Sequence, residues 1–183
     1  MKNLFPLLLL VLLFSTCQDD EAVTPDPYDE ELQLEIVTGI NVRDVNAAPL
    51  GSYGNPNVFS GEVDFYPNPA LGQANVIYFG AAGLNVKQYW IFAASVDTSY
   101  ADINYNLLLD NATYSPDEVA ALNVVQTNTV NQQGFALNLE GFTPGYYRIF
   151  YLMSDNTLYW DNIYVDPTAS DQLNLTSELS DDF

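Results

Sequence analysis

The chain contains no histidine and only one cysteine among its 183 residues. The lack of histidine excludes the Ser-His-Asp and Cys-His catalytic arrangements, the usual imidazole general base and the zinc sites built on histidine. A single cysteine can form neither an intramolecular disulfide nor a cysteine-rich zinc site. A glycosidase-like mechanism remains possible, because it needs only two Asp or Glu residues at a suitable distance.

Basic residues are also scarce, since 4 lysines and arginines face 24 acidic residues and give a formal net charge of −20. Phosphate binding needs clustered positive charge, so nucleic acid is excluded as a partner. Acidic side chains at predicted turns suit calcium in type, but no D-x-D-x-D-G-type spacing is present, and we expect neither a metal nor another cofactor. These turn residues are Asp97, Asp102, Asp110, Asp155 and Asp161.

The one long apolar run lies at the start of the chain. Lys2 supplies a positive charge, residues 4–14 are apolar except for Pro6, and small residues follow at 15 and 16. This run is too short to span a bilayer comfortably, and its order is typical of a secretory signal peptide. We therefore expect residues 1–16 to be a leader that is removed.

The cysteine directly follows this leader. Residues 14–17, Phe-Ser-Thr-Cys, resemble the lipobox of bacterial lipoproteins, which implies that Cys17 is lipidated and becomes the first mature residue. The four residues after it resemble the acidic export signal of Bacteroidota surface lipoproteins. That resemblance implies an outer-membrane anchor with the protein facing the medium; an ordinary leader followed by a solvated acidic linker is the alternative. The export signal comprises Gln18, Asp19, Asp20 and Glu21.

The remaining chain divides by composition into three parts. Residues 17–31 are acidic, carry two prolines and predict an extended tether. Residues 32–166 have the length and apolar content of one domain with a sizeable core. Residues 167–183 are acidic again and predict a loose C-terminal tail, in which three leucines at 173, 175 and 179 offer at most weak packing.

The domain pattern predicts short strands and one short helix. Residues 88–94 are apolar on both faces, as in a central strand that buries Trp90, and residues 146–165 predict a hairpin with its turn at 154–157. Residues 115–122 begin with a capping-box pattern and predict the helix. The Gly-, Pro- and Asn-rich residues 46–61 predict a long surface loop. Further strands are expected at 32–36, 40–43, 63–65, 74–79, 124–130 and 135–139, which together indicate an all-β sandwich.

Two short motifs carry a second resemblance. Residues 66–70, Tyr-Pro-Asn-Pro-Ala, resemble the opening of the C-terminal sorting domain of type IX secretion, a small immunoglobulin-like β-sandwich. Residues 143–149, Thr-Pro-Gly-Tyr-Tyr-Arg-Ile, resemble the turn and aromatic strand near the end of such a domain. The resemblance covers residues 63–165 and implies an immunoglobulin-like fold. The chain continues past that point into the acidic tail, so the resemblance concerns the fold more than the export route.

We expect a non-catalytic surface lipoprotein with a binding or structural role in the outer-membrane envelope. Its expected partners, besides the membrane itself, are an extracellular glycan or another envelope protein. One alternative is a glycan-binding accessory lipoprotein of a polysaccharide-uptake system, because exposed aromatic rings can stack on sugar faces; a carboxylate-pair glycosidase is another. The candidate ligand-binding residues are Tyr53, Tyr100, Tyr105 and Trp160.

Overall fold

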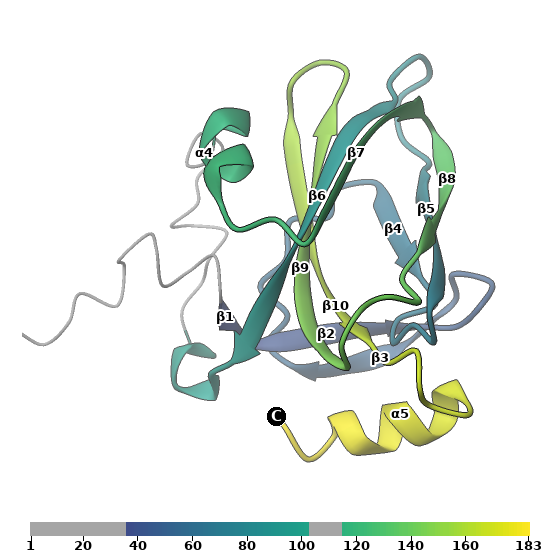
Figure 1. The fold of residues 1–183 in the computed structure, drawn as a ribbon, viewed down its shortest axis with the longest axis vertical. Coiled ribbons are helices and arrows are strands. Elements are labelled where there is room, and N and C mark those ends of the chain that lie inside the picture. The colour runs from purple at the N-terminus through teal and green to yellow at the C-terminus, as the bar shows by residue number, and fades with distance from the viewer. Residues whose placement is uncertain (1–35, 103–114) are drawn as a thin grey trace, which may run out of the picture.

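A computed structural model describes residues 36–102 and 115–183, which form mostly β-structure (Figure 1). The signal peptide, Cys17, the export signal, the tether and Tyr105 lie outside the described residues. The strands are β1 (Ile36–Val37), β2 (Gly39–Arg43), β3 (Pro49–Gly54), β4 (Val63–Tyr66), β5 (Gln73–Tyr78), β6 (Val86–Val96), β7 (Gln126–Gln132), β8 (Gly134–Asn138), β9 (Gly145–Met153) and β10 (Leu158–Val165). The helical elements are the 3₁₀ turn η1 (Thr98–Tyr100) and the helices α4 (Pro116–Ala121) and α5 (Gln172–Leu179).

Two sheets face each other across the main core. One has the order β4-β5-β8, and the other has the order β1-β6-β9-β10, with β7 also paired to β6. Strand β5 alternates exposed and buried side chains, as a strand with one face on the core and one in solvent should. Strand β9 is buried over most of its length because its outer face is covered as well. The core residues come from β4, β5, β6, β8, β9 and β10, together with Ala70 and Leu139 in the connecting segments.

The hairpin β9–β10 confirms the expectation for residues 146–165. Its register pairs Leu158 with Leu152 and continues to Val165 opposite Gly145. In the turn, the Asp155 carboxylate accepts a hydrogen bond from the Thr157 N–H at 3.0 Å, and Asn156 has a φ of 71°. Asparagine tolerates this left-handed conformation, so the turn residues account for the turn position.

Helix α4 also confirms its expectation. The Ser115 hydroxyl accepts from the Glu118 N–H, the Glu118 carboxylate accepts from the Ser115 N–H, and Pro116 occupies the first turn. Val119 on this helix is buried and joins a second apolar cluster on the outer face of the β6-β9-β10 sheet. Trp90 belongs to that cluster, which confirms that it is buried. Figure 1 shows α4 on the side of β6 and β9 that faces away from β5 and β8.

The expectation of a long loop at residues 46–61 is wrong for its central part. Strand β3 pairs with β2 there, Ile40 opposite Tyr53, with a register irregularity between Val42 and Arg43. Most side chains of β3 are exposed, so no apolar alternation marks the strand, and its glycines and proline resemble turn residues. At Gly39 the two arms approach so closely that a Cβ atom would overlap the backbone of Tyr53 and Asn55.

The C-terminal residues 167–183 are not loose, and the described part has two helices where one was expected. Helix α5 buries Leu175 and Leu179, each 1% exposed, while Leu173 is 78% exposed. Two leucines four residues apart lie on one helix face, which explains why an acidic segment can dock. Figure 1 shows α5 beside β3 at one end of the molecule.

The expected strands 124–130 and 135–139 exist with shifted bounds, but they belong to different sheets. Strand β7 pairs with β6, whereas β8 pairs with β5. The chain therefore crosses from one sheet to the other between Gln132 and Gly134. None of the helices in the described ranges has the length and apolar content needed to cross a membrane.

Candidate functional site

Arg148 is a positive charge enclosed by the fold, with only 1% of its surface exposed. It lies on β9 directly opposite Asn162 of β10, on the outer face of the sheet. Its Nε donates to the Asn162 Oδ1 at 3.1 Å, and its Nη2 donates to the Ile36 carbonyl at 2.6 Å. An arginine stays protonated in proteins, and a buried charge is costly unless it is hydrogen-bonded, so these acceptors offset the cost of burying Arg148. Arg148 thereby ties β1 to the hairpin β9–β10.

Arg43, at the end of β2, joins the two sheets through two carboxylates. Its Nε lies 3.2 Å from the Asp64 Oδ1 on β4, and its Nη1 lies 3.2 Å from the Asp161 Oδ2 on β10. Strand β4 borders one sheet and β10 borders the other. The Arg43 guanidinium therefore bridges β4 and β10, the edge strands of the two sheets, and attaches β2 to both of them.

Asp161 is fully buried, and this burial raises its pKa from 3.8 to about 6. The Arg43 charge and the Asn162 N–H both lower the pKa, but they offset only part of the burial cost. Tyr151 is buried beside this group, and its hydroxyl has no hydrogen-bond partner within the described part of the chain. Burial and the Asp161 carboxylate raise the pKa of Tyr151 well above its ordinary value. Since Asp161 and Tyr151 are closed off from solvent, this cluster can stabilise the fold but cannot reach a substrate.

Asn68 gives the Pro-Asn-Pro motif a structural role that sequence reasoning missed. Its side-chain amide donates to the backbone carbonyls of Asn41 at 2.7 Å and of Asn162 at 3.0 Å. Its Oδ1 accepts from the Tyr164 N–H at 3.1 Å. The buried amide thus connects β2 with β10 and satisfies backbone groups that strand pairing leaves over. The motif itself gives no signal for hydrogen-bond partners 27 and 94 residues away.

The predicted aromatic candidates do not form an open platform. Trp160 is 5% exposed, and its Nε1 donates to the Asn57 carbonyl at 3.3 Å. Tyr100 is partly buried against the same apolar cluster that contains Trp160 and lies under α4. Tyr53 lies on β3 and is not part of that cluster. The structure brings Tyr100 and Trp160 together as core residues, and the ring of Trp160 has no face open to a sugar.

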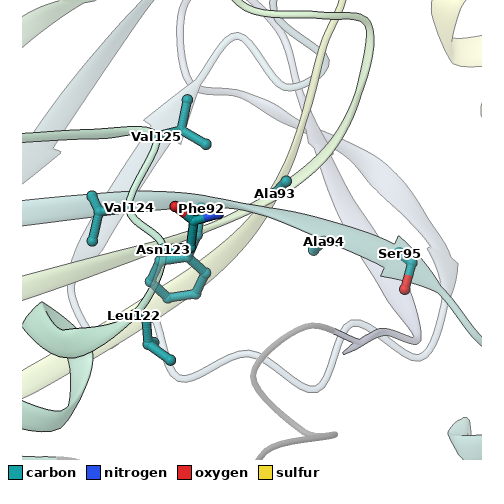
Figure 2. A pocket seen from close by; sticks show the side chains of 8 residues that line it. All are labelled: Phe92, Ala93, Ala94, Ser95, Leu122, Asn123, Val124 and Val125. Carbon is teal, nitrogen blue, oxygen red and sulfur yellow. The ribbon is translucent and has the colours of Figure 1, made fainter.

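One hollow of about 420 Å³ lies beside β6, between the points where β7 and β1 pair with it (Figure 2). At one end of the hollow, the Val125 N–H, just before β7, donates to the Ile91 carbonyl of β6 at 2.7 Å. At the other end, β1 pairs with β6 from Ser95 onward. Figure 2 shows the Phe92 ring and Leu122 on the same side of β6. None of the lining side chains is ionisable, so this hollow offers a largely apolar surface and no side-chain acid or base. The lining residues are Phe92, Ala93, Ala94, Ser95, Leu122, Asn123, Val124 and Val125.

A second hollow, of about 470 Å³, lies where the start of α5 meets β5 and the turn of the β2–β3 hairpin. We call it the β5 hollow. Four of its lining residues carry amide or carboxyl side chains, and Glu140 supplies the single carboxylate. Its lining residues are Val45, Pro67, Leu71, Gly72, Gln73, Asn75, Glu140 and Gln172.

Asp97 and Asp155 act as turn residues, whereas Asp161 lies buried on β10, where it pairs with Arg43, and not in a turn. Asp110 lies outside the described residues. The Asp97 carboxylate caps η1 by accepting from the Ser99 N–H at 3.0 Å. Residues 36–102 and 115–183 contain no group of three acidic or cysteine side chains arranged to hold a metal ion. Comparisons with protein-family models, with curated proteins and with solved structures find no match to this chain.

Proposed function

We propose that this protein is a lipid-anchored surface protein of the outer membrane with a non-catalytic binding or structural role. The leader, Cys17 and the acidic residues 18–21 support the anchor and its outward-facing location. One structural observation carries the non-catalytic part: the charged groups inside the described fold are used to join strands. Arg43, Asp64 and Asp161 join the two sheets, and Arg148 joins β1 to β9 and β10.

We further propose that the two facing sheets form an immunoglobulin-like sandwich. The order β4-β5-β8 corresponds to strands A, B and E of such a fold. The order β7-β6-β9-β10 corresponds to an additional edge strand followed by C, F and G. In this assignment the hairpin β2–β3 and helix α5 lie outside the sandwich and are additions to it at one end.

The glycosidase alternative requires two carboxylates on either side of a bound sugar, roughly 5 to 9.5 Å apart. Asp64 and Asp161 share the same arginine, and Asp161 is closed to solvent. The two hollows above offer one carboxylate between them, that of Glu140. These observations favour the binding role over hydrolysis.

The proposal is tested by expressing the full chain in a Bacteroidota host and following its location. The unchanged protein should fractionate with the outer membrane and be degraded when intact cells are treated with protease. Cys17→Ala should release the protein from the membrane fraction, because its lipid attachment point is gone. The triple variant Asp19→Asn, Asp20→Asn, Glu21→Gln should remain in the membrane but become protected from protease. A Cys17→Ala protein that still fractionates with the membrane would contradict the proposal.

A further inference from the structure

The β5 hollow combines open hydrogen-bonding groups with apolar walls. Gln73 and Asn75 are exposed on the outward face of β5, and neither side chain hydrogen-bonds to another described residue. Gln172 is held in place, because its Nε2 donates to the Arg43 carbonyl at 2.7 Å. Glu140 is exposed and lines the same hollow from the segment after β8. Primary amides both donate and accept, and the carboxylate accepts, so the hollow presents both kinds of group.

A tyrosine stands beside Asn75 on the neighbouring strand, just outside the residues that line the hollow. Tyr66 on β4 is the cross-strand partner of Asn75, and Ala136 on β8 is its partner on the other side. Directly opposed residues have their Cβ atoms about 4.5–5.5 Å apart and on the same face of the sheet. Tyr66 is only partly buried. Ala136 is exposed, and its small side chain does not cover Asn75 from the other side.

The same geometry argues against two other classes of ligand. Strand β5 is the central strand of its sheet, and Asn75 is paired on both sides, so an extended peptide cannot add to its backbone. The lining of the hollow contains the carboxylate of Glu140 but no lysine or arginine. The whole chain has a net charge of −20. An anionic ligand would therefore meet repulsion without a compensating cation.

We propose that the β5 hollow binds a neutral oligosaccharide, with Gln73, Asn75 and Glu140 hydrogen-bonding to sugar hydroxyls and Tyr66 stacking against one ring. A hydroxyl donates and accepts at the same atom, which matches the amides and the carboxylate. The volume of about 470 Å³ falls within the range of about 300–1,000 Å³ found for small-ligand sites. This inference rests on the proposed surface location, where extracellular glycans are within reach, and it assigns a site different from the four aromatic candidates.

The test is titration calorimetry with the full chain purified in detergent from cells that process it. The neutral probes are cellohexaose, maltohexaose and xylohexaose; hexagalacturonic acid is the anionic probe and an Ala-Lys decapeptide is the basic probe. We expect one neutral hexasaccharide to bind and the other two classes not to bind. The double variant Gln73→Ala, Asn75→Ala should weaken that binding by at least about tenfold, since two hydrogen bonds are lost. Tyr66→Ala should weaken it as well.

The matched control is Asn128→Ala, Thr129→Ala on β7, which changes two exposed strand residues away from the hollow. It should bind like the unchanged protein. Circular dichroism on each variant checks that the fold is retained. The inference is overturned if no neutral hexasaccharide binds, if the acidic probe or the peptide binds instead, or if the two double variants bind equally well. The membrane and protease experiments are independent of sugar binding, so either proposal can fail without the other.

Discussion

Replacing Asp161 with asparagine should remove a pH-dependent loss of stability. Burial raises the pKa of Asp161 from 3.8 to about 6, so the folded protein holds this proton more tightly than the unfolded chain does. The group's contribution is therefore largest below about pH 4, declines as the pH rises from about 4 to about 6, and is lost above that range. Raising the pKa from 3.8 to about 6 lowers the unfolding free energy at neutral pH by about 3 kcal/mol, relative to strongly acidic pH.

The assay is urea denaturation of the full chain at pH values from 4 to 8, followed by fluorescence of the buried Trp90 and Trp160. Asparagine resembles the protonated aspartic acid in shape and charge. Between pH 4 and 7 the unchanged protein should therefore lose roughly 2–3 kcal/mol more unfolding free energy than Asp161→Asn does. Asp181→Asn, at an exposed position near the C-terminus, serves as the control and should follow the unchanged protein.

Carboxylates whose pKa is lowered by hydrogen bonds, such as those of Asp44 and Glu118, lie near the surface and are present in both proteins. Their contribution has the opposite sign, being lost as the pH falls, and it cancels when the two proteins are compared. Parallel stability curves for the unchanged protein and Asp161→Asn would refute the claim that burial governs this carboxyl group.

Further substitutions probe other parts of the fold. Arg148→Met should destabilise the protein by about 3 kcal/mol in urea denaturation. The reason is that the Asn162 Oδ1 and the Ile36 carbonyl lose the donor of their hydrogen bonds. Gly39→Ala should cost about 1–3 kcal/mol in the same assay, because its Cβ atom would overlap the backbone of the facing hairpin arm. Ser115→Ala should cost about 1 kcal/mol through loss of the α4 cap. Leu179→Ala should cost about 2–5 kcal/mol by thermal unfolding, whereas Leu173→Ala, at an exposed position on the same helix, should change stability by less than about 0.5 kcal/mol.

Local sequence signals predicted the elements whose determinants lie close together in the chain. The capping box of α4 spans Ser115 to Glu118, and the β9–β10 turn is fixed by neighbouring residues such as Asn156. The alternation in β5 likewise appears within six residues. In each case the physical cause acts over a few residues, so the pattern alone was sufficient to place the element.

The elements that were missed depend on distant partners. Strand β3 has mostly exposed side chains and is fixed by pairing with β2 rather than by its own periodicity. Helix α5 is held by burial of two leucines and by the Tyr146 hydroxyl, which donates to the Asp182 carboxylate at 2.7 Å. Two leucines four residues apart in a short acidic segment are too few to predict a docked helix, and the contact with Tyr146 leaves no local pattern.

The candidate site was harder to predict than the fold. An aromatic side chain does not reveal from sequence whether its ring faces solvent, and Trp160 lies in a core between the sheet and α4. The β5 hollow is assembled from residues between Val45 and Gln172 that share no local motif. The pairing of β5 with β4 and β8, together with the hydrogen bond from Gln172 to the Arg43 carbonyl, brings these residues to one place.

The most direct test of the account is mass spectrometry of the mature N-terminus, because the proposed location and partners depend on the anchor at Cys17. The full chain would be purified from the envelope of a Bacteroidota host and digested, and its N-terminal peptide would be measured. The account predicts a peptide that starts at Cys17 and carries the mass of attached acyl chains. A peptide with an unmodified thiol at this position, or one that retains the leader, would contradict it.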